Sequence, residues 1–161
     1  MLVIEVVGDP APQGSKRAIP IKSKATGAFT GKVNMVESSK KVKPWRTDVR
    51  DAVLALKAAP IDGAVNVGIT FFLKRPKAHY RTGKFAHLLR DDAPVYPDVK
   101  PDIDKLARAT LDALTSAGIY ADDCKVVDLH TRKRYADHRL PGASIQLITK
   151  TNDRNAPGRL A

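Results

Sequence analysis

Four aspartates bracket one predicted helix near the middle of the chain, and their spacing suits carboxylate chemistry. Asp102 and Asp104 open the segment 102–117, and Asp122 and Asp123 follow its end. Mg²⁺ prefers such oxygens and is usually held by one or two carboxylates together with phosphate oxygens of a substrate. If the chain folds back after the helix, the two pairs could converge and leave open positions for a phosphate and an attacking water. The sequence therefore predicts a Mg²⁺ site, with Mn²⁺ as an alternative ion.

The segment 102–117 carries the signals of a helix that would position these groups. Asp102 is a favourable N-cap, and Gly118 stands where a left-handed C-cap is expected. Asp104 and Arg108 are four residues apart and therefore share one side of the helix. Another side would carry an apolar stripe made of Leu106, Thr110, Ala113, Leu114 and Ala117.

A plainer explanation of the four aspartates stays open. Acids at a helix start complement the helix dipole without binding any ligand, and a pair such as Asp122 and Asp123 is common in a polar turn. Short acidic motifs arise by chance in many chains. Two pairs around one helix in so basic a chain weaken this explanation without removing it.

The run KPDIDKLARATLDALTSAGIYADDCKVV, residues 100–127, resembles the signature segment of the RusA family of Holliday-junction resolvases, particularly its phage-type members. The flanks fit more loosely, with a GSKR loop near the start and a basic strand after the acidic pair. The resemblance implies that Asp102, Asp104 and Asp123 bind the metal and that Asp122 is an accessory ligand. It also places Arg108 among the catalytic residues, at a position where family members often carry lysine.

The same resemblance implies a function. It implies that this protein is a Mg²⁺-dependent, structure-selective endodeoxyribonuclease. Such an enzyme nicks paired strands of four-way junctions in recombination, repair or phage DNA processing. RusA-like enzymes act as homodimers, and two symmetric nicks give a reason for two identical sites. Lys105 stands where an asparagine is common in the family, and we assign it to DNA contact.

Composition favours a polyanionic partner. The 161 residues carry 28 Lys and Arg against 17 Asp and Glu, a net charge of +11 with a pI of about 9.9. Nucleic acid is the leading candidate, because no long basic amphipathic helix or lipidation motif points to a membrane. A single cysteine excludes an internal disulfide, and no apolar run approaches the length of a membrane span. We expect a cytoplasmic protein of a bacterial or phage-infected host cell.

The predicted fold is a single α+β domain over residues 1–150, RusA-like, followed by a polar tail at 151–161. Strands are expected at 2–8, 65–74, 125–135 and 143–149, and a helix at 39–59 whose core stripe is Val42, Trp45, Val49, Val53 and Leu56. Two helices with four or five strands suggest a mixed sheet. On the strand 125–135, Val127, Leu129 and Tyr135 are expected in the core.

Basic side chains lie in several segments where DNA phosphates could bind, although a solvated surface explains each of them about as well. One segment is a loop after the first strand. Another is the stretch 76–100, predicted to be a long irregular loop that clamps DNA and is disordered without it. A third is the face of the strand 125–135 that carries His130. The DNA-binding candidates are Lys16, Arg17, Arg75, Lys77, Arg81, Lys105, Arg132 and Arg134.

Two alternatives from other functional classes remain. A basic DNA-binding protein without catalysis would use the same positive charge, yet acids around one helix would oppose phosphate binding. A metal-dependent nuclease that acts on flaps or RNA would keep the aspartates and differ in the shape of its substrate.

Overall fold

A four-stranded mixed sheet forms the body of the protein. The computed structural model describes residues 1–14, 16–37 and 40–150, with the side chains of Lys16, Arg17 and residues 35–37 outside that description. The sheet order is β1-β6-β4-β5, in which β6 runs antiparallel to both β1 and β4 and β5 runs parallel to β4. These strands are β1 (Leu2–Val7), β4 (Ala64–Leu73), β5 (Val126–Tyr135) and β6 (Gly142–Lys150). The expected α+β class and mixed sheet are confirmed.

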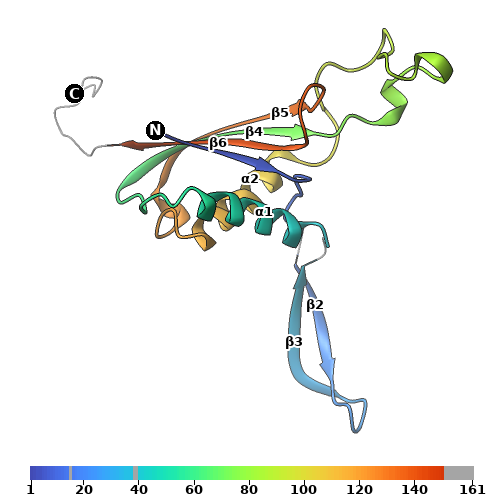
Figure 1. The fold of residues 1–161 in the computed structure, drawn as a ribbon. Coiled ribbons are helices and arrows are strands. Elements are labelled where there is room, and N and C mark those ends of the chain that lie inside the picture. Colours follow the sequence, from blue (N-terminus) through green and yellow to red (C-terminus); the bar gives the residue numbers. More distant parts are fainter. Residues whose placement is uncertain (15, 38–39, 151–161) are drawn as a thin grey trace, which may run out of the picture.

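Helices α1 (Val42–Ala55) and α2 (Ile103–Ser116) cover one face of the sheet, as Figure 1 shows. Every second residue of β4 is buried against them, because alternate side chains of a strand point to opposite faces. Trp45 of α1 is fully buried, and its indole N–H donates to Thr110 Oγ1 of α2 at 3.1 Å. The prediction that Trp45 anchors the core is confirmed.

Parts of the predicted core are exposed at the margins of the helical layer. Val127 and Leu129 of β5 are 62% and 41% exposed, so their assignment to the core was wrong. β5 is an edge strand, and the helices leave that part of the sheet uncovered. Tyr135, at the far end of β5, is buried as expected. Leu56 is also exposed, since it follows the last residue of α1 and lies beyond the covered face.

A second, separate sheet replaces the predicted loop after β1. Strands β2 (Lys16–Lys22) and β3 (Phe29–Glu37) pair antiparallel and project from the body as a hairpin arm (Figure 1). No strand was predicted here, because the arm buries no apolar face and Pro20 argues against a strand. Proline is tolerated since both strands of a two-stranded ribbon are edges.

The stretch 76–100 is a long loop without an α-helix or a named strand, as predicted; it projects from the body and folds back on itself (Figure 1). It contains the short 3₁₀ turns η1 (Lys77–His79) and η2 (Gly83–Phe85). The backbone N–H of Arg81 donates to Leu88 at 2.9 Å, and that of Arg90 donates to His79 at 2.9 Å. The proposed clamping of DNA stays a prediction, as does the disorder expected without DNA.

No helix within the described ranges is both long and apolar enough to cross a membrane. The predicted polar tail at 151–161 lies outside the described residues.

Candidate active site at the two ends of helix α2

The first acidic pair stands at the N-terminal end of α2. Asp102 is the N-cap residue by backbone position, but its side chain makes no capping hydrogen bond, contrary to the prediction. Its carboxylate instead accepts from Lys105 Nζ at 2.6 Å, and this contact lowers the pKa of Asp102. Asp104 is exposed in the first turn, and Arg108 is exposed one turn further along the helix. Asp104 and Arg108 therefore both face solvent, as the sequence predicts.

The neighbouring strand fixes the chain as it enters α2. Lys133 Nζ of β5 donates to the carbonyls of Val99 at 2.9 Å and Pro101 at 3.1 Å. The backbone N–H of Gln13 donates to the carbonyl of Lys105 at 3.0 Å. Lys133 thus positions the acidic pair, a role with no signal in the sequence because its two acceptors are backbone carbonyls more than 30 residues away.

The second acidic pair follows the C-terminal end of α2. Gly118 takes the expected left-handed conformation, with φ at 75°. Asp122 caps the short turn η3 (Asp123–Lys125) by accepting from the backbone N–H of Cys124 at 2.8 Å, which lowers the pKa of Asp122. Asp123 is exposed. A groove of about 350 Å³ lies here, lined by Arg46, Asp112, Thr115, Ser116, Asp122 and Asp123.

Arg46 of α1 and Asp112 of α2 form an ion pair inside this groove. Sequence reasoning assigned neither residue to the site, although the four-residue spacing of Asp104, Arg108 and Asp112 marks one side of α2. The groove therefore contains one basic side chain, that of Arg46, and three carboxylates. Arg46 is already paired with one of them, Asp112.

The two acidic pairs do not converge within one protomer. At about 1.5 Å per residue, α2 rises roughly 18 Å between Asp104 and Ser116, and the groove with Asp123 lies beside Ser116. Among residues 1–14, 16–37 and 40–150, no three His, Cys, Asp or Glu side chains are grouped closely enough to hold a metal ion. A single protomer therefore does not bring the two acidic pairs to one point, as the sequence had suggested it could.

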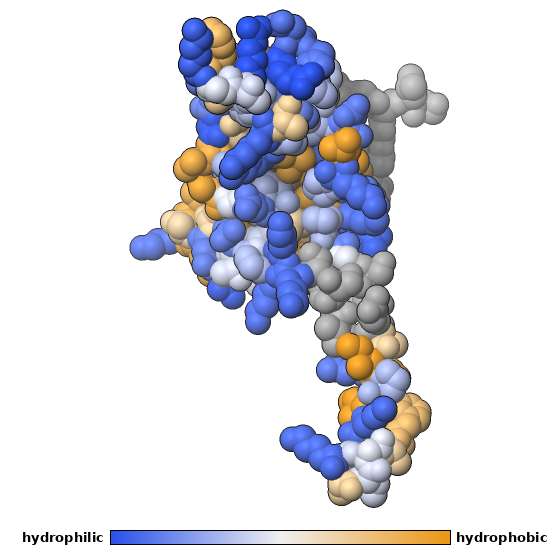
Figure 2. Space-filling model, turned by 90° about the vertical axis from the view of Figure 1, so that its right-hand side faces the viewer, coloured by the Kyte–Doolittle hydropathy of each residue, from blue (hydrophilic) through white to orange (hydrophobic). Residues whose placement is uncertain are grey.

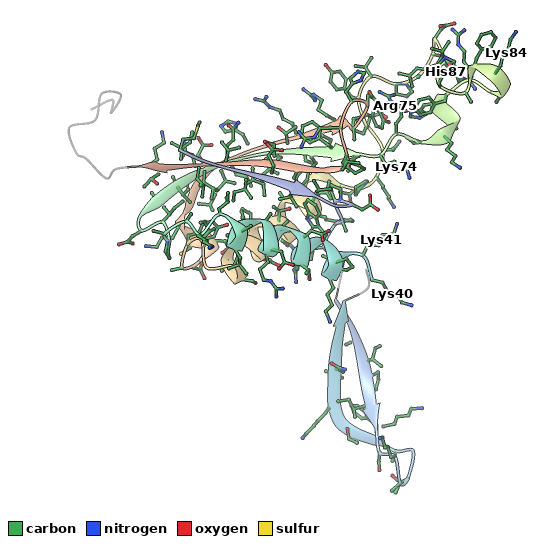
Figure 3. All side chains as sticks on the ribbon, viewed as in Figure 1. Lys40, Lys41, Lys74, Arg75, Lys84 and His87 are labelled. Carbon is green, nitrogen blue, oxygen red and sulfur yellow. The ribbon has the colours of Figure 1, made fainter. Side chains whose placement is uncertain are left out.

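A basic groove of about 280 Å³ opens beside the first acidic pair. Lys41, Lys74 and Lys100 line it together with Asp9, and its walls include Pro97 and Pro101. Figure 3 shows Lys41 and Lys74 on one side of the molecule, between the base of the hairpin arm and the start of the 76–100 stretch. The groove thus places three lysines near Pro101, the residue before Asp102.

Arg75 was predicted to contact DNA, but its surroundings favour a structural role. Its side chain is only 5% exposed, and it donates to both oxygens of Asp137 at 2.6 and 2.7 Å. It also donates to the carbonyl of Pro94 at 2.7 Å and stacks over Tyr135 at 3.9 Å. These contacts attach the end of the 76–100 stretch to the body. They also hold the pKa of Asp137 below its usual value.

The other DNA-binding candidates are dispersed. Lys77 is exposed in η1, and Arg81 pairs with Asp91 at 2.7 Å. Arg132 and His130 line a groove of about 270 Å³ on the face of the sheet that the helices leave open. Arg134 is also exposed on β5, where its guanidinium lies 4.9 Å from the ring of Tyr96. Lys16 and Arg17 lie in β2, with side chains outside the described part.

Comparison with known proteins gives one family. A sequence model of the family described as endodeoxyribonuclease RusA matches residues 15–148 of the 161-residue chain, which includes the hairpin arm and both ends of α2. A search of curated proteins returned no match.

Proposed function

Because the chain belongs to the RusA family of endodeoxyribonucleases, we propose that it hydrolyses phosphodiester bonds at four-way DNA junctions. The family match over residues 15–148 is the observation that carries this proposal. Membership makes the protein a hydrolase that acts on DNA. Junction selectivity, a requirement for Mg²⁺ or Mn²⁺, a role in recombination or repair and a cytoplasmic location are our proposals.

We propose further that the working form is a homodimer, since one protomer leaves its acidic pairs at opposite ends of α2. A two-fold axis places one surface against its own copy in the opposite direction. If the axis passes near the middle of α2, Asp104 of one protomer lies near Asp123 of the other. The exposed Val127 and Leu129 on β5, close in sequence to the η3 turn that carries Asp123, offer an apolar surface for such contact.

In this arrangement the side chains have separate tasks. The acidic pairs Asp102–Asp104 and Asp122–Asp123 would hold the cation between protomers, and Arg108 would approach the phosphate as a fixed positive charge. The basic groove with Lys41, Lys74 and Lys100 would bind the backbone, with little regard for sequence.

The test is cleavage of a substrate panel by the wild-type protein. We expect nicking of a four-way junction in Mg²⁺, little or no nicking of linear duplex, flap or RNA substrates, and none in EDTA. Asp51→Asn, which removes an exposed carboxylate of α1 that pairs only with its neighbour Arg50, is the matched control and should cleave normally. Equal cleavage of flaps and junctions would contradict the junction selectivity.

One observation favours a second candidate, a DNA-binding protein without catalysis. No three metal-binding side chains converge within a single described protomer. Such a protein would bind junctions equally well with Mg²⁺ or EDTA and would leave every substrate intact, so the same panel separates the two functions.

A further inference from the structure

The hairpin arm, residues 16–37, is a two-stranded ribbon that stands away from the body (Figure 1). Its strands pair with each other and with no strand of the main sheet. Isolated two-stranded hairpins are marginally stable in water. An arm of this kind is therefore a candidate for contact with a partner.

The tip of the arm is well organised. The backbone N–H of Ser23 donates to Ala28 at 2.8 Å, and that of Gly27 donates back to Ser23 at 2.9 Å. Gly27 has a φ of 68°, a left-handed conformation that glycine adopts without strain. Thr30 Oγ1 also donates to the carbonyl of Ile21 at 2.8 Å, next to the tip. The shape of the tip is thus set before any partner binds.

Apolar side chains on the arm face solvent. Ile19, Ile21, Phe29 and Val33 are 41–58% exposed. Figure 2 shows hydrophobic surface on the projecting arm beside hydrophilic surface. Exposed apolar groups gathered on one projecting element mark a surface that is covered when a partner binds.

Charge decides which partner fits. The arm carries five cations, Lys16, Arg17, Lys22, Lys24 and Lys32, against the single carboxylate of Glu37. The homodimer contact proposed above is made by β5 and not by the arm, and a further copy with a net charge of +11 would meet the arm's cations with like charge. A polyanion with apolar surface inside its grooves matches both the charge and the exposed apolar groups.

We infer that the hairpin arm inserts into branched DNA, with its lysines on the phosphates and Phe29 and Val33 against bases at the branch point. The major groove of B-DNA admits a two-stranded ribbon. Apolar side chains inserted between base steps must unstack them, and this costs least where the stack is already interrupted. The branch point of a junction is such a place. This inference rests on the proposed junction substrate and gives it a recognition element.

The test compares Phe29→Ser/Val33→Ser with Leu54→Ser/Leu56→Ser. The control pair is similarly exposed but lies at the end of α1. Each protein is titrated in EDTA with a junction that carries 2-aminopurine at the branch point, and separately with a linear duplex of equal length. We expect the arm variant to bind the junction about tenfold more weakly, the effect of one stacked base, and to show no fluorescence rise. Linear duplex binding and the control should stay near wild type.

A charge variant tests the phosphate contacts separately. Lys22→Ala/Lys24→Ala/Lys32→Ala should lower the slope of log K against log salt by about 0.9 for each phosphate that the arm no longer neutralises, or roughly 2.7 in all. Wild-type fluorescence and affinity in the apolar variant would overturn the inference even if the protein cleaves junctions. A fall in the dimer fraction without DNA would also overturn it, because the arm would then bind a second copy. Binding and unstacking without cleavage would refute the proposed function and leave the arm's role intact.

Discussion

The four aspartates around α2 are held in two different ways. Asp102 is paired with Lys105, and Asp122 is occupied by a backbone N–H. Asp104 and Asp123 are exposed, and neither forms an ion pair in the described part of the chain. One carboxylate at each end of the helix is therefore engaged within the protomer, and the other is directed to solvent. These two are the most direct candidates for substrate or cation contact.

We predict that Asp104→Asn and Asp123→Asn each lower junction cleavage by at least about a hundredfold while the fold survives. The change keeps the size of the side chain and removes a charge that a hard cation needs. Junction binding should persist, and in metal-free buffer it should tighten, since an acidic cluster repels phosphate. Cleavage rates, circular dichroism and binding in EDTA measure these effects.

If the two aspartates served only as a helix N-terminal acid and a turn residue, each change would cost at most about 1 kcal/mol of stability. Cleavage would then stay normal. Near-wild-type nicking by one folded variant would refute the assignment of that residue. Near-wild-type nicking by both variants would leave only the structural explanation of the aspartates.

The sequence identified these residues but not their distance from each other. The resemblance over residues 100–127 names them, and the apolar stripe correctly predicts the helix between them. A straight helix of 14 residues is long enough to keep its two ends apart, which is why the predicted convergence within one chain fails. Arg46 and Lys133 were missed because their partners are distant in the chain.

At the scale of elements, two projecting segments differ in how they are attached to the body. The 76–100 stretch is anchored at its end by Arg75, whose contacts reach Asp137 and the carbonyl of Pro94. The hairpin arm has no anchor of this kind among the described side chains. Periodicity predicted β4 and both helices because each buries one face. Periodicity could not predict the arm, because the pairing of β2 with β3 buries no apolar face.

We predict that Asp137→Asn destabilises the protein by about 2–4 kcal/mol, because it leaves the buried guanidinium of Arg75 without its counter-charge. The pKa of Asp137 is lowered in the folded state. Its contribution is therefore fully present above the unfolded carboxyl pKa of about 3.9 and is lost as pH falls through the lower folded value. Urea unfolding at pH 7 and at pH 3 measures the difference.

The gap between wild type and Asp137→Asn should narrow at the lower pH. Limited proteolysis should also cut residues 77–97 faster in the variant, since the Arg75 anchor is weakened. Asp62→Asn, an exposed carboxylate without an ion pair in the described structure, should change stability by less than about 0.5 kcal/mol. An equal effect of both changes would show that the anchor contributes nothing.

At the scale of the whole molecule, a site that takes Asp104 from one protomer and Asp123 from the other can be tested with dimers made of two different variants. In a heterodimer of Asp104→Asn and Asp123→Asn chains, one site combines both changes and the other combines both native residues. If each site lay within one protomer, both sites would be defective. Mixed dimers therefore report which chain supplies each carboxylate.

We predict that co-refolded Asp104→Asn and Asp123→Asn proteins regain about a quarter of the wild-type rate of single nicks, since half the dimers are mixed and half of their sites are intact. Each variant alone should stay inactive.

Asp102→Asn mixed with Asp104→Asn is the matched control. Both changes lie at the same end of α2, so every site of every dimer keeps a defect and no activity should return. Mixed dimers isolated with two affinity tags should nick one strand of a junction without resolving it. If they form and yet stay inactive, the acidic pairs do not meet across the two-fold axis, and the shared site is refuted whatever the wild-type protein cleaves.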